Sequence, residues 1–169
     1  PANLARLTAL IEQARPRRLV FLGDLLHARE AHGSESLRRF AQWRAQHAAL
    51  PITLVEGNHD RHAGAPGPEF DIDLVAEPWV TDGVAFCHHP QRLPGAAVVA
   101  GHLHPCIRLY GAAGDSVRLP CFWIRSGVMA LPAFGEFTGG APIEREAGDR
   151  VLAVADGRLF DVPSVARAA

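Results

Sequence analysis

The sequence lacks the features that mark membrane and disulfide-rich secreted proteins. No stretch approaches eighteen consecutive apolar residues, and no charged-then-apolar leader with a cleavage site opens the chain. Cysteine is scarce: Cys87, Cys106 and Cys121 are odd in number and form no C-x-x-C pair, which argues against a disulfide framework and a structural zinc site. We therefore expect a soluble, cytoplasmic protein with buried free thiols and no membrane partner.

A strong charge imbalance, internal repeats and low-complexity tracts are also lacking. The net charge is -1, so no overall basic field indicates nucleic-acid binding. No basic run interleaved with aromatic residues predicts a platform for single strands. Any contact with DNA phosphates would come from a local group of arginines, although a solvated helix face explains the N-terminal ones equally well. The arginines that could contact phosphates are Arg15, Arg17, Arg18, Arg38, Arg39, Arg44 and Arg61.

Apolar residues make up 48% of the 169 residues, which suffices for the buried core of one domain. We therefore expect a single domain over residues 1–169. Histidine is the outlier, because nine is a high number for this length and most of the nine stand beside Gly, Asp, Asn or Pro. The clustering of histidines in loop sequences indicates a functional site.

Apolar spacing predicts helices at 4–15 and 34–47 and strands at 18–22 and 52–55. The second half is strand-rich. Asp156-Gly157 predicts a two-residue hairpin turn, and Asp115-Ser116 is a second candidate turn. This order of elements favours an α/β fold with two sheets packed face to face and flanked by helices. Further strands are expected at 72–76, 84–87, 96–100, 107–110, 120–125, 151–155 and 158–162.

Polar residues follow the buried strands in one repeated pattern: a strand, often a glycine, then Asp, Asn or His. In open α/β sheets ligands bind beyond the carboxyl ends of the strands, so these side chains are expected to converge on one crevice. The glycines would let the backbone crowd a bound ion or phosphate. The set is Asp24, Asn58, His59, Asp60, His88, His102 and His104.

Carboxylate, amide and imidazole donors without thiolate suit Mn, Fe or Zn rather than Ca or a structural zinc. His102 and His104 are two residues apart, so on an extended chain they would share a face and could serve adjacent metals. Two metals about 3.5 to 4 Å apart can clamp the attacking and leaving oxygens of a phosphoryl transfer. Each motif alone also fits an ordinary turn or a solvated loop. Their combination favours a metal site.

The series Gly23-Asp24, Gly57-Asn-His-Asp60, His88 and Gly101-His-Leu-His104 resembles the calcineurin-like metallophosphoesterases. That resemblance implies a four-layer α/β/β/α sandwich with a dinuclear metal centre. Longer segments, among them residues 86–90 and 131–139, are similar to the ligase-associated DNA damage response endonucleases (PdeM) within that superfamily.

The resemblance implies two divalent metal ions, with Mn favoured and Fe or Zn as alternatives. Asp24 would bridge both metals. Asn58, His88 and His102 would complete the second metal site, and His104 would bind the first metal. A hydroxide held by the metals would be the nucleophile.

His59 would not ligate a metal but would protonate the leaving oxygen or stabilise the transition state, with Asp60 holding its ring. His89 stands where many relatives have glycine, so the ligand at this point is either His88 or His89. The candidate substrate-binding residues are His27, Arg61, His62 and His89. His27 and His62, like the neighbouring His32, also fit plain loop positions.

One motif of the family does not precede Gly23-Asp24: the first strand that ends in Asp-x-His and gives two ligands to the first metal. Either the sequence omits an N-terminal segment or the protein is truncated. On the residues present, the first metal keeps only Asp24 and His104. We therefore expect this chain to lack the first strand of the sandwich and to be a poor catalyst by itself.

The resemblance implies a phosphodiesterase or endonuclease that acts on DNA in repair, with an ATP-dependent DNA ligase and a helicase of the same system as partners. The same centre also serves phosphatases and phosphodiesterases of small phosphorylated metabolites, because loops set the substrate. A third hypothesis is a non-catalytic scaffold in a repair complex. The retained His59 and Asp60 argue against a scaffold, and the absent Asp-x-His argues for it.

Overall fold

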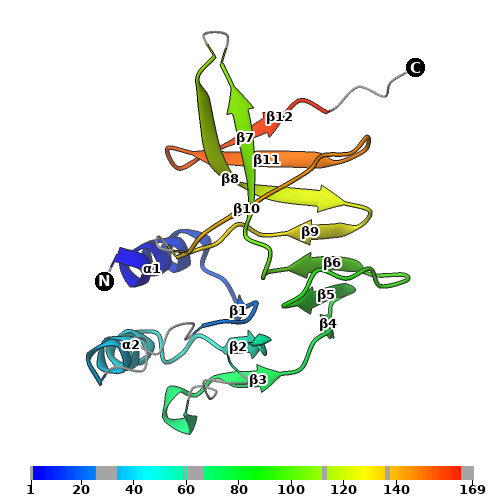
Figure 1. Ribbon diagram of the computed structural model, residues 1–169. Helices are drawn as coiled ribbons and strands as arrows, with labels where there is room; N and C mark the ends of the chain where they lie inside the picture. Colours follow the sequence, from blue (N-terminus) through cyan, green and yellow to red (C-terminus); the bar gives the residue numbers. More distant parts are fainter. Residues whose placement is uncertain are drawn as a thin grey trace. The chain divides into compact units, whose positions relative to one another are not determined.

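The structure of the protein, a computed structural model, describes residues 2–25, 34–58, 60, 67–111, 114–135 and 138–164. The chain divides into two units, Pro1–Trp79 and Val80–Ala169. Figure 1 shows the helices α1 and α2 beside a small sheet in the first unit, and a larger sheet in the second. Within the described residues, no helix is both long and apolar enough to cross a membrane.

The first unit contains two helix–strand pairs, as the apolar spacing predicts. Helix α1 (Ala2–Ala14) precedes strand β1 (Leu19–Phe21), and helix α2 (Ser34–Gln46) precedes strand β2 (Ile52–Val55). Strand β3 (Asp73–Val75) completes a parallel sheet in the order β1-β2-β3. Because the strands are parallel, their carboxyl ends share one edge of the sheet.

A core of large apolar side chains holds the helices to this sheet. Phe40 and Trp43 of α2 lie one turn apart on the buried face, and their ring centroids are 5.5 Å apart. Phe40 also packs against Phe70 in the 3₁₀ turn η2 (Pro68–Phe70), with the ring centroids 5.3 Å apart. The Trp43 indole donates a hydrogen bond to Thr8 of α1. These contacts fix the two helices to each other.

Among the described residues, the larger sheet has nine strands. They are β4 (Trp79–Thr81), β5 (Val84–Cys87), β6 (Ala97–Ala100), β7 (Pro105–Tyr110), β8 (Ser116–Arg125), β9 (Val128–Ala130), β10 (Ala141–Pro142), β11 (Arg150–Ala155) and β12 (Arg158–Val162). Seven strands follow the order β10-β7-β8-β9-β6-β5-β4, and β11 pairs with β8 and β12. Strands β5, β6 and β9 are parallel neighbours, so their carboxyl ends also meet at one edge. The mixed α/β class is confirmed.

The parallel strands β5 and β6 contribute small buried side chains to the core, namely Ala85, Val98 and Ala100. All three cysteines are buried and free, which confirms the expectation from their number and spacing. Burial, together with the neighbouring Cys106, raises the pKa of the Cys121 thiol to about 12. This thiol is therefore protonated and unreactive at neutral pH.

The hairpin turns confirm one prediction and correct another. Asp156 and Gly157 both have positive φ, at 49° and 69°, as a two-residue turn between β11 and β12 requires. The turn expected at Asp115-Ser116 is displaced, because Ser116 already begins β8 and the amide of Gly111 donates to the Asp115 carbonyl across the loop. Ser116, expected to lie in the turn, is thus the first residue of a strand.

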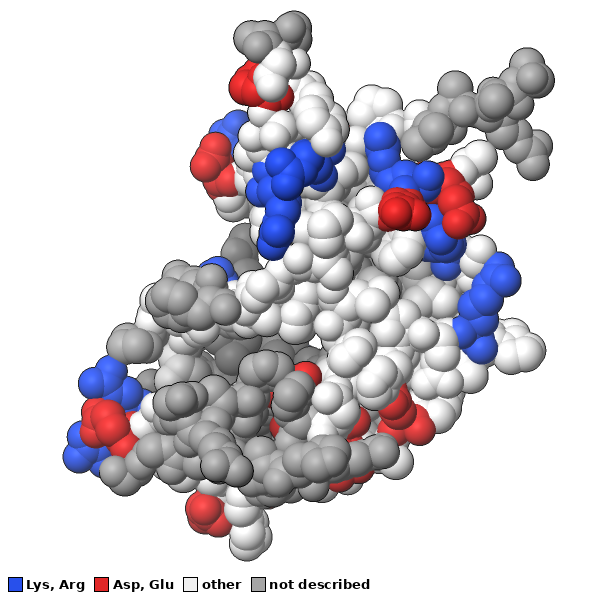
Figure 2. Space-filling view, in the orientation of Figure 1, with Lys and Arg blue, Asp and Glu red and all other residues white. Residues whose placement is uncertain are grey.

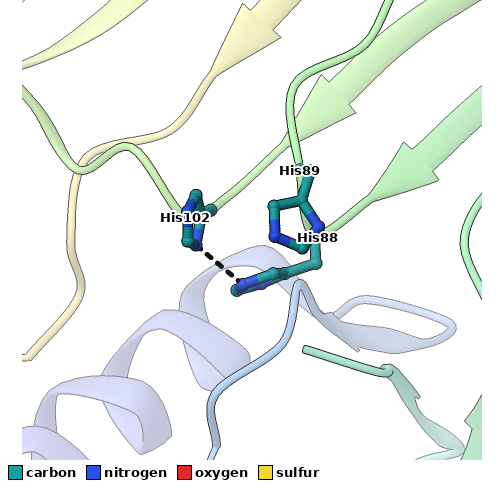
Figure 3. A group of neighbouring side chains, drawn as sticks. All are labelled: His88, His89 and His102. Atoms are coloured by element: carbon teal, nitrogen blue, oxygen red, sulfur yellow. Dashed lines mark hydrogen bonds between the residues drawn. The ribbon is translucent and has the colours of Figure 1, made fainter. Parts of the chain in front are cut away.

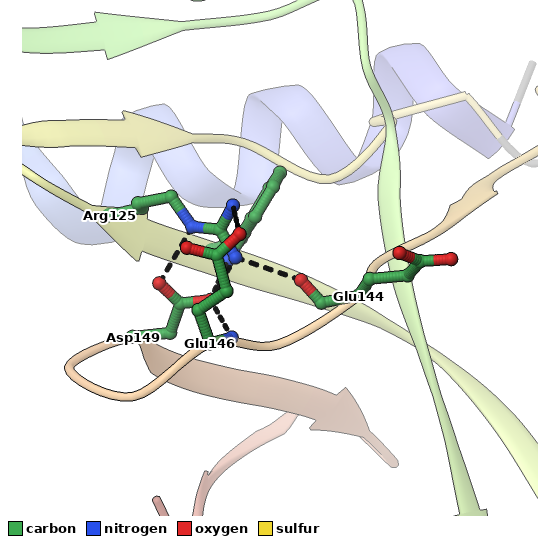
Figure 4. A network of polar contacts seen from close by, with 5 residues as sticks. Arg125, Glu144, Glu146 and Asp149 are labelled. Atoms are coloured by element: carbon green, nitrogen blue, oxygen red, sulfur yellow. Dashed lines mark hydrogen bonds and ion pairs between the residues drawn. The ribbon is translucent and has the colours of Figure 1, made fainter. Parts of the chain in front are cut away.

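An arginine at the end of β8 ties the following segment to the sheet (Figure 4). Arg125 donates to both carboxylate oxygens of Asp149 at 2.8 and 2.7 Å, to Glu146 at 3.0 Å and to the Glu144 carbonyl at 2.8 Å. This hydrogen-bonded guanidinium holds the pKa of Asp149 well below its usual range although the carboxyl is buried. The positive charge of Arg125 is therefore balanced within the fold.

Candidate metal centre

The first candidate ligand follows β1 at the carboxyl edge of the small sheet. Gly23 and Asp24 both adopt left-handed backbone conformations, with φ of 86° and 54°. Glycine adopts such a φ freely, and Asp tolerates it better than most residues. The pair turns the chain sharply at the end of the strand, where parallel-sheet ligands are placed.

Gly57, directly beyond the end of β2, leaves room for Asp24. A Cβ atom built on Gly57 would clash with the Asp24 carboxylate oxygen Oδ1 and would lie 2.7 Å from the Asp24 backbone nitrogen. Glycine is therefore required for the loops after β1 and β2 to touch. The sequence pattern attributes this glycine to a bound ion or phosphate, whereas the structure shows it crowded by the neighbouring candidate ligand.

Asp60 fastens these two loops together. Its side-chain oxygen Oδ2 accepts hydrogen bonds from the backbone amides of Asp24 at 2.7 Å and of Gly57 at 3.0 Å. Asp60 is only 2% exposed; its bond to Gly57 is buried and its bond to Asp24 is partly buried. A carboxylate that accepts two buried amides fixes the backbone of a candidate ligand. Sequence reasoning assigned Asp60 to the ring of His59 and missed this role.

Replacing Gly57 by Ala is expected to push the two loops apart. The added methyl group meets the backbone atoms of Asp24 and Gly23, which cannot rotate away, and overpacking of this kind costs roughly 1 to 3 kcal/mol. We expect a lower melting temperature and less bound Mn, measured by thermal unfolding and elemental analysis. Gly139→Ala is the matched control, because a Cβ at Gly139 meets nothing within 4 Å. Equal behaviour of the two variants would contradict the close contact.

In the second unit, three imidazoles gather beyond the carboxyl ends of β5 and β6 (Figure 3). His88 and His89 follow β5, and His102 follows β6. One ring nitrogen from each lies within 4.8 Å of the others. His88 is 1% exposed, so its ring is held by the surrounding protein. Parallel pairing of β5 with β6 brings these residues together from two loops.

The spacing of these nitrogens fits a cation. Nε2 of His88 and Nδ1 of His102 are 3.0 Å apart and share a hydrogen bond. Two imidazoles bound to one metal at about 2.0 to 2.1 Å would have nitrogens roughly 2.9 to 3.4 Å apart, for octahedral to tetrahedral angles. The pair is therefore spaced as neighbouring ligands of one ion would be. His89 belongs to the same group, so the choice between His88 and His89 stays open.

The expected geometry of the Gly101-His-Leu-His104 segment is wrong in one respect. His102 and His104 do not lie on an extended chain, because both have left-handed φ values of 61° and 46°. The amide of Leu103 donates to the Gly101 carbonyl at 2.7 Å, which closes a tight turn. Strained conformations of this kind cluster at functional sites. His102 joins the histidine group, whereas His104 is not a member of it.

Several candidates fall outside the described residues. They are His27, His59, Arg61 and His62. Asn58 is described and lies next to Gly57, with helical backbone. The metal and catalytic roles expected for these positions remain predictions.

Most described arginines named as phosphate contacts are engaged within the fold. Arg44 is 5% exposed and donates to the carbonyls of Phe70 and His47, which makes it a structural residue. Arg18 pairs with Asp73 at 2.9 Å. Arg38 and Arg39 both pair with Glu35 on the surface of α2.

Comparisons with known proteins agree with this chemistry. The family model for calcineurin-like phosphoesterases matches residues 1–116. No curated protein matches the chain. Among solved structures, the chain is similar to the crystal structure of the Pseudomonas putida nuclease MPE, with a TM-score of 0.86 and 43% sequence identity, over 95% of this chain and 78% of that one. The chain thus belongs to the calcineurin-like phosphoesterase family and is a metal-dependent hydrolase of phosphate esters.

Proposed function

We propose that this protein is a DNA phosphodiesterase that acts as an endonuclease in DNA repair. The observation that carries the proposal is its similarity to a nuclease, at 43% identity over 95% of the chain. The protein contains no lysine, so all 17 basic residues are arginine, the side chain best suited to bidentate phosphate contacts. The proposed partners, an ATP-dependent DNA ligase and a helicase, rest on the sequence resemblance alone.

We propose that two divalent cations, with manganese favoured over iron or zinc, are bound by five residues. His88 and His102 support the proposal by the 3.0 Å spacing of their ring nitrogens. Asp24 supports it by its position in a left-handed turn after β1, where its amide donates a hydrogen bond to Asp60. The proposed ligands are Asp24, Asn58, His88, His102 and His104.

When bound, a pair of cations activates water and neutralises the charge of the reacting phosphate. We propose that His59 gives a proton to the leaving oxygen and that Asp60 orients its ring. Within the described residues, Oδ1 of Asp60 is buried and has no hydrogen-bond partner, which leaves an acceptor for that role. His27, Arg61, His62 and His89 are proposed to contact the substrate.

A second candidate function, hydrolysis of a small phosphorylated metabolite, is favoured by a pocket of about 400 Å³ in the second unit. Pro90 and Leu103 form part of its wall, and these residues are direct neighbours of His89 and His102. Trp123 adds an apolar surface. The volume lies within the range of small-molecule sites.

Ionic strength separates the two functions. In a form of the chain that carries an N-terminal Asp-x-His strand, we expect Mn-dependent nicking of plasmid DNA that weakens steeply with added salt, since phosphate contacts release counterions. Hydrolysis of a small phosphate monoester should change much less over the same range. Turnover of phosphorylated metabolites without any cleavage of DNA would overturn the nuclease proposal and favour the second candidate.

A further inference from the structure

Two arginines stand side by side on the β7–β8 hairpin. Arg108 of β7 and Arg118 of β8 are register partners in this antiparallel pair, so their side chains share one face. The next register pair on that face is Tyr110 with Ser116. Arg108 and Arg118 are exposed, and Figure 2 shows basic side chains over the middle of this hairpin. The face is therefore open to a partner.

The charges of this pair are not balanced within the described part of the chain. Arg108 donates to the Ser116 hydroxyl at 3.2 Å and Arg118 to the Gly140 carbonyl at 3.1 Å. Both acceptors are neutral, whereas Arg125 and Arg150 each pair with a carboxylate. Like charges directly opposite each other destabilise a strand pair. The arrangement is unfavourable for the hairpin alone and favourable for an anionic ligand.

An aromatic side chain extends the same face. Tyr110 is 77% exposed, more than any other large apolar side chain found exposed among the described residues. Exposed aromatic rings next to basic side chains form surfaces on which the bases or sugars of a nucleic acid stack. The nearest acidic residue in sequence, Asp115, lies at the tip of the hairpin beyond Tyr110.

The hairpin also starts directly after His104, a proposed metal ligand. Strand β7 begins at Pro105, immediately after His104, and Arg108 is four residues along from that histidine. At about 3.4 Å per residue, four residues span at most roughly 14 Å. A nucleic-acid strand bound near the histidine loops could therefore extend along β7 to Arg108.

We propose that Arg108 and Arg118 bind backbone phosphates of the substrate nucleic acid, with Tyr110 stacking against an adjacent sugar or base. This surface deepens the proposed nuclease function, on which it rests. It supplies affinity for a polymeric substrate outside the place where the phosphodiester is cleaved. A small phosphodiester does not reach it.

The test is the salt dependence of DNA binding, measured by fluorescence anisotropy with a labelled oligonucleotide in chelator. Removing two phosphate contacts in Arg108→Ser/Arg118→Ser should lower the slope of log affinity against log salt by about 1.4 to 1.8. Between 50 and 200 mM salt, the loss of affinity would then be roughly sevenfold to twelvefold smaller than for the parent. Tyr110→Ser should weaken binding about fivefold or more without changing the slope.

Matched variants exclude a folding artefact. Arg108→Lys/Arg118→Lys should keep the slope, and Arg150→Ser, which removes an exposed arginine already paired with Asp161 at 3.3 Å, should lower it less. An unchanged slope in Arg108→Ser/Arg118→Ser, an equal drop in Arg150→Ser, or no DNA binding by the parent would overturn the proposal. Binding that depends on the arginine pair, with no DNA cleavage in Mn by a form of the chain that carries an N-terminal Asp-x-His strand, would instead overturn the nuclease function and leave the surface standing.

Discussion

Replacing Asp24 by Asn is expected to remove bound metal and hydrolysis together, whereas replacing His59 by Ala should leave metal content nearly unchanged. Asp24 is proposed as the carboxylate shared by two cations, so its loss removes the negative charge that lets them lie close. Asn tolerates the left-handed φ of 54° at this position as well as Asp does, so the loop should keep its shape. The effect would then report on the carboxylate itself.

His59 is assigned to proton transfer, so His59→Ala should lower turnover by a factor of roughly 10² to 10⁴. Both variants would be made in a form of the chain that carries an N-terminal Asp-x-His strand. Bound Mn would be measured by elemental analysis, and turnover with an aryl phosphodiester. Loss of metal from His59→Ala but not from Asp24→Asn would reverse the two roles.

Adding an N-terminal strand that ends in Asp-x-His should turn a weak one-metal binder into an active two-metal enzyme. On the proposed assignment, the first metal has only the shared Asp24 and His104. An added carboxylate would offset the repulsion between two nearby cations and an added imidazole would complete the ligand set. The sheet order places β1 at an edge of the small sheet, with β2 in the centre, so a new strand can pair there.

Pairing along β1 should also cover an edge that no other strand pairs with among the described residues, and unpaired edges promote association. We therefore expect the extended chain to be more soluble and to melt at a higher temperature. The two forms would be compared by bound Mn per chain, plasmid nicking and thermal unfolding. Two metals per chain and equal turnover in the shorter form would show that Asp-x-His is not needed for the working site.

The regular elements were predictable because their signals are local. The strand at 52–55 and the turn at Asp156-Gly157 follow from apolar runs and turn chemistry alone. The turn at Ser126-Gly127, with φ of 51° and 81°, escaped notice because serine is a weaker signal than Asp or Asn at that position. Strand β10 is two residues long and has no pattern of its own.

The residue types of the candidate site were predictable from the sequence, but the hydrogen bonds that hold its loops together were not. Gly-Asp and Gly-Asn-His-Asp motifs identify donors, yet only strand pairing shows that the Asp60 side chain accepts the amide of Asp24, thirty-six residues away. The arginines show the same limit. Arg44 and Arg108 are alike in sequence, but burial among backbone carbonyls makes the first structural, and register with Arg118 makes the second a candidate phosphate contact.

The most direct test of metal-dependent DNA hydrolysis is plasmid nicking by the chain extended with an N-terminal Asp-x-His strand, stripped of metal with a chelator and then titrated with Mn. The proposed function predicts no nicking by the stripped protein, verified as metal-free by elemental analysis, and recovery in proportion to bound Mn. Nicking at the full rate by the verified metal-free protein would contradict it.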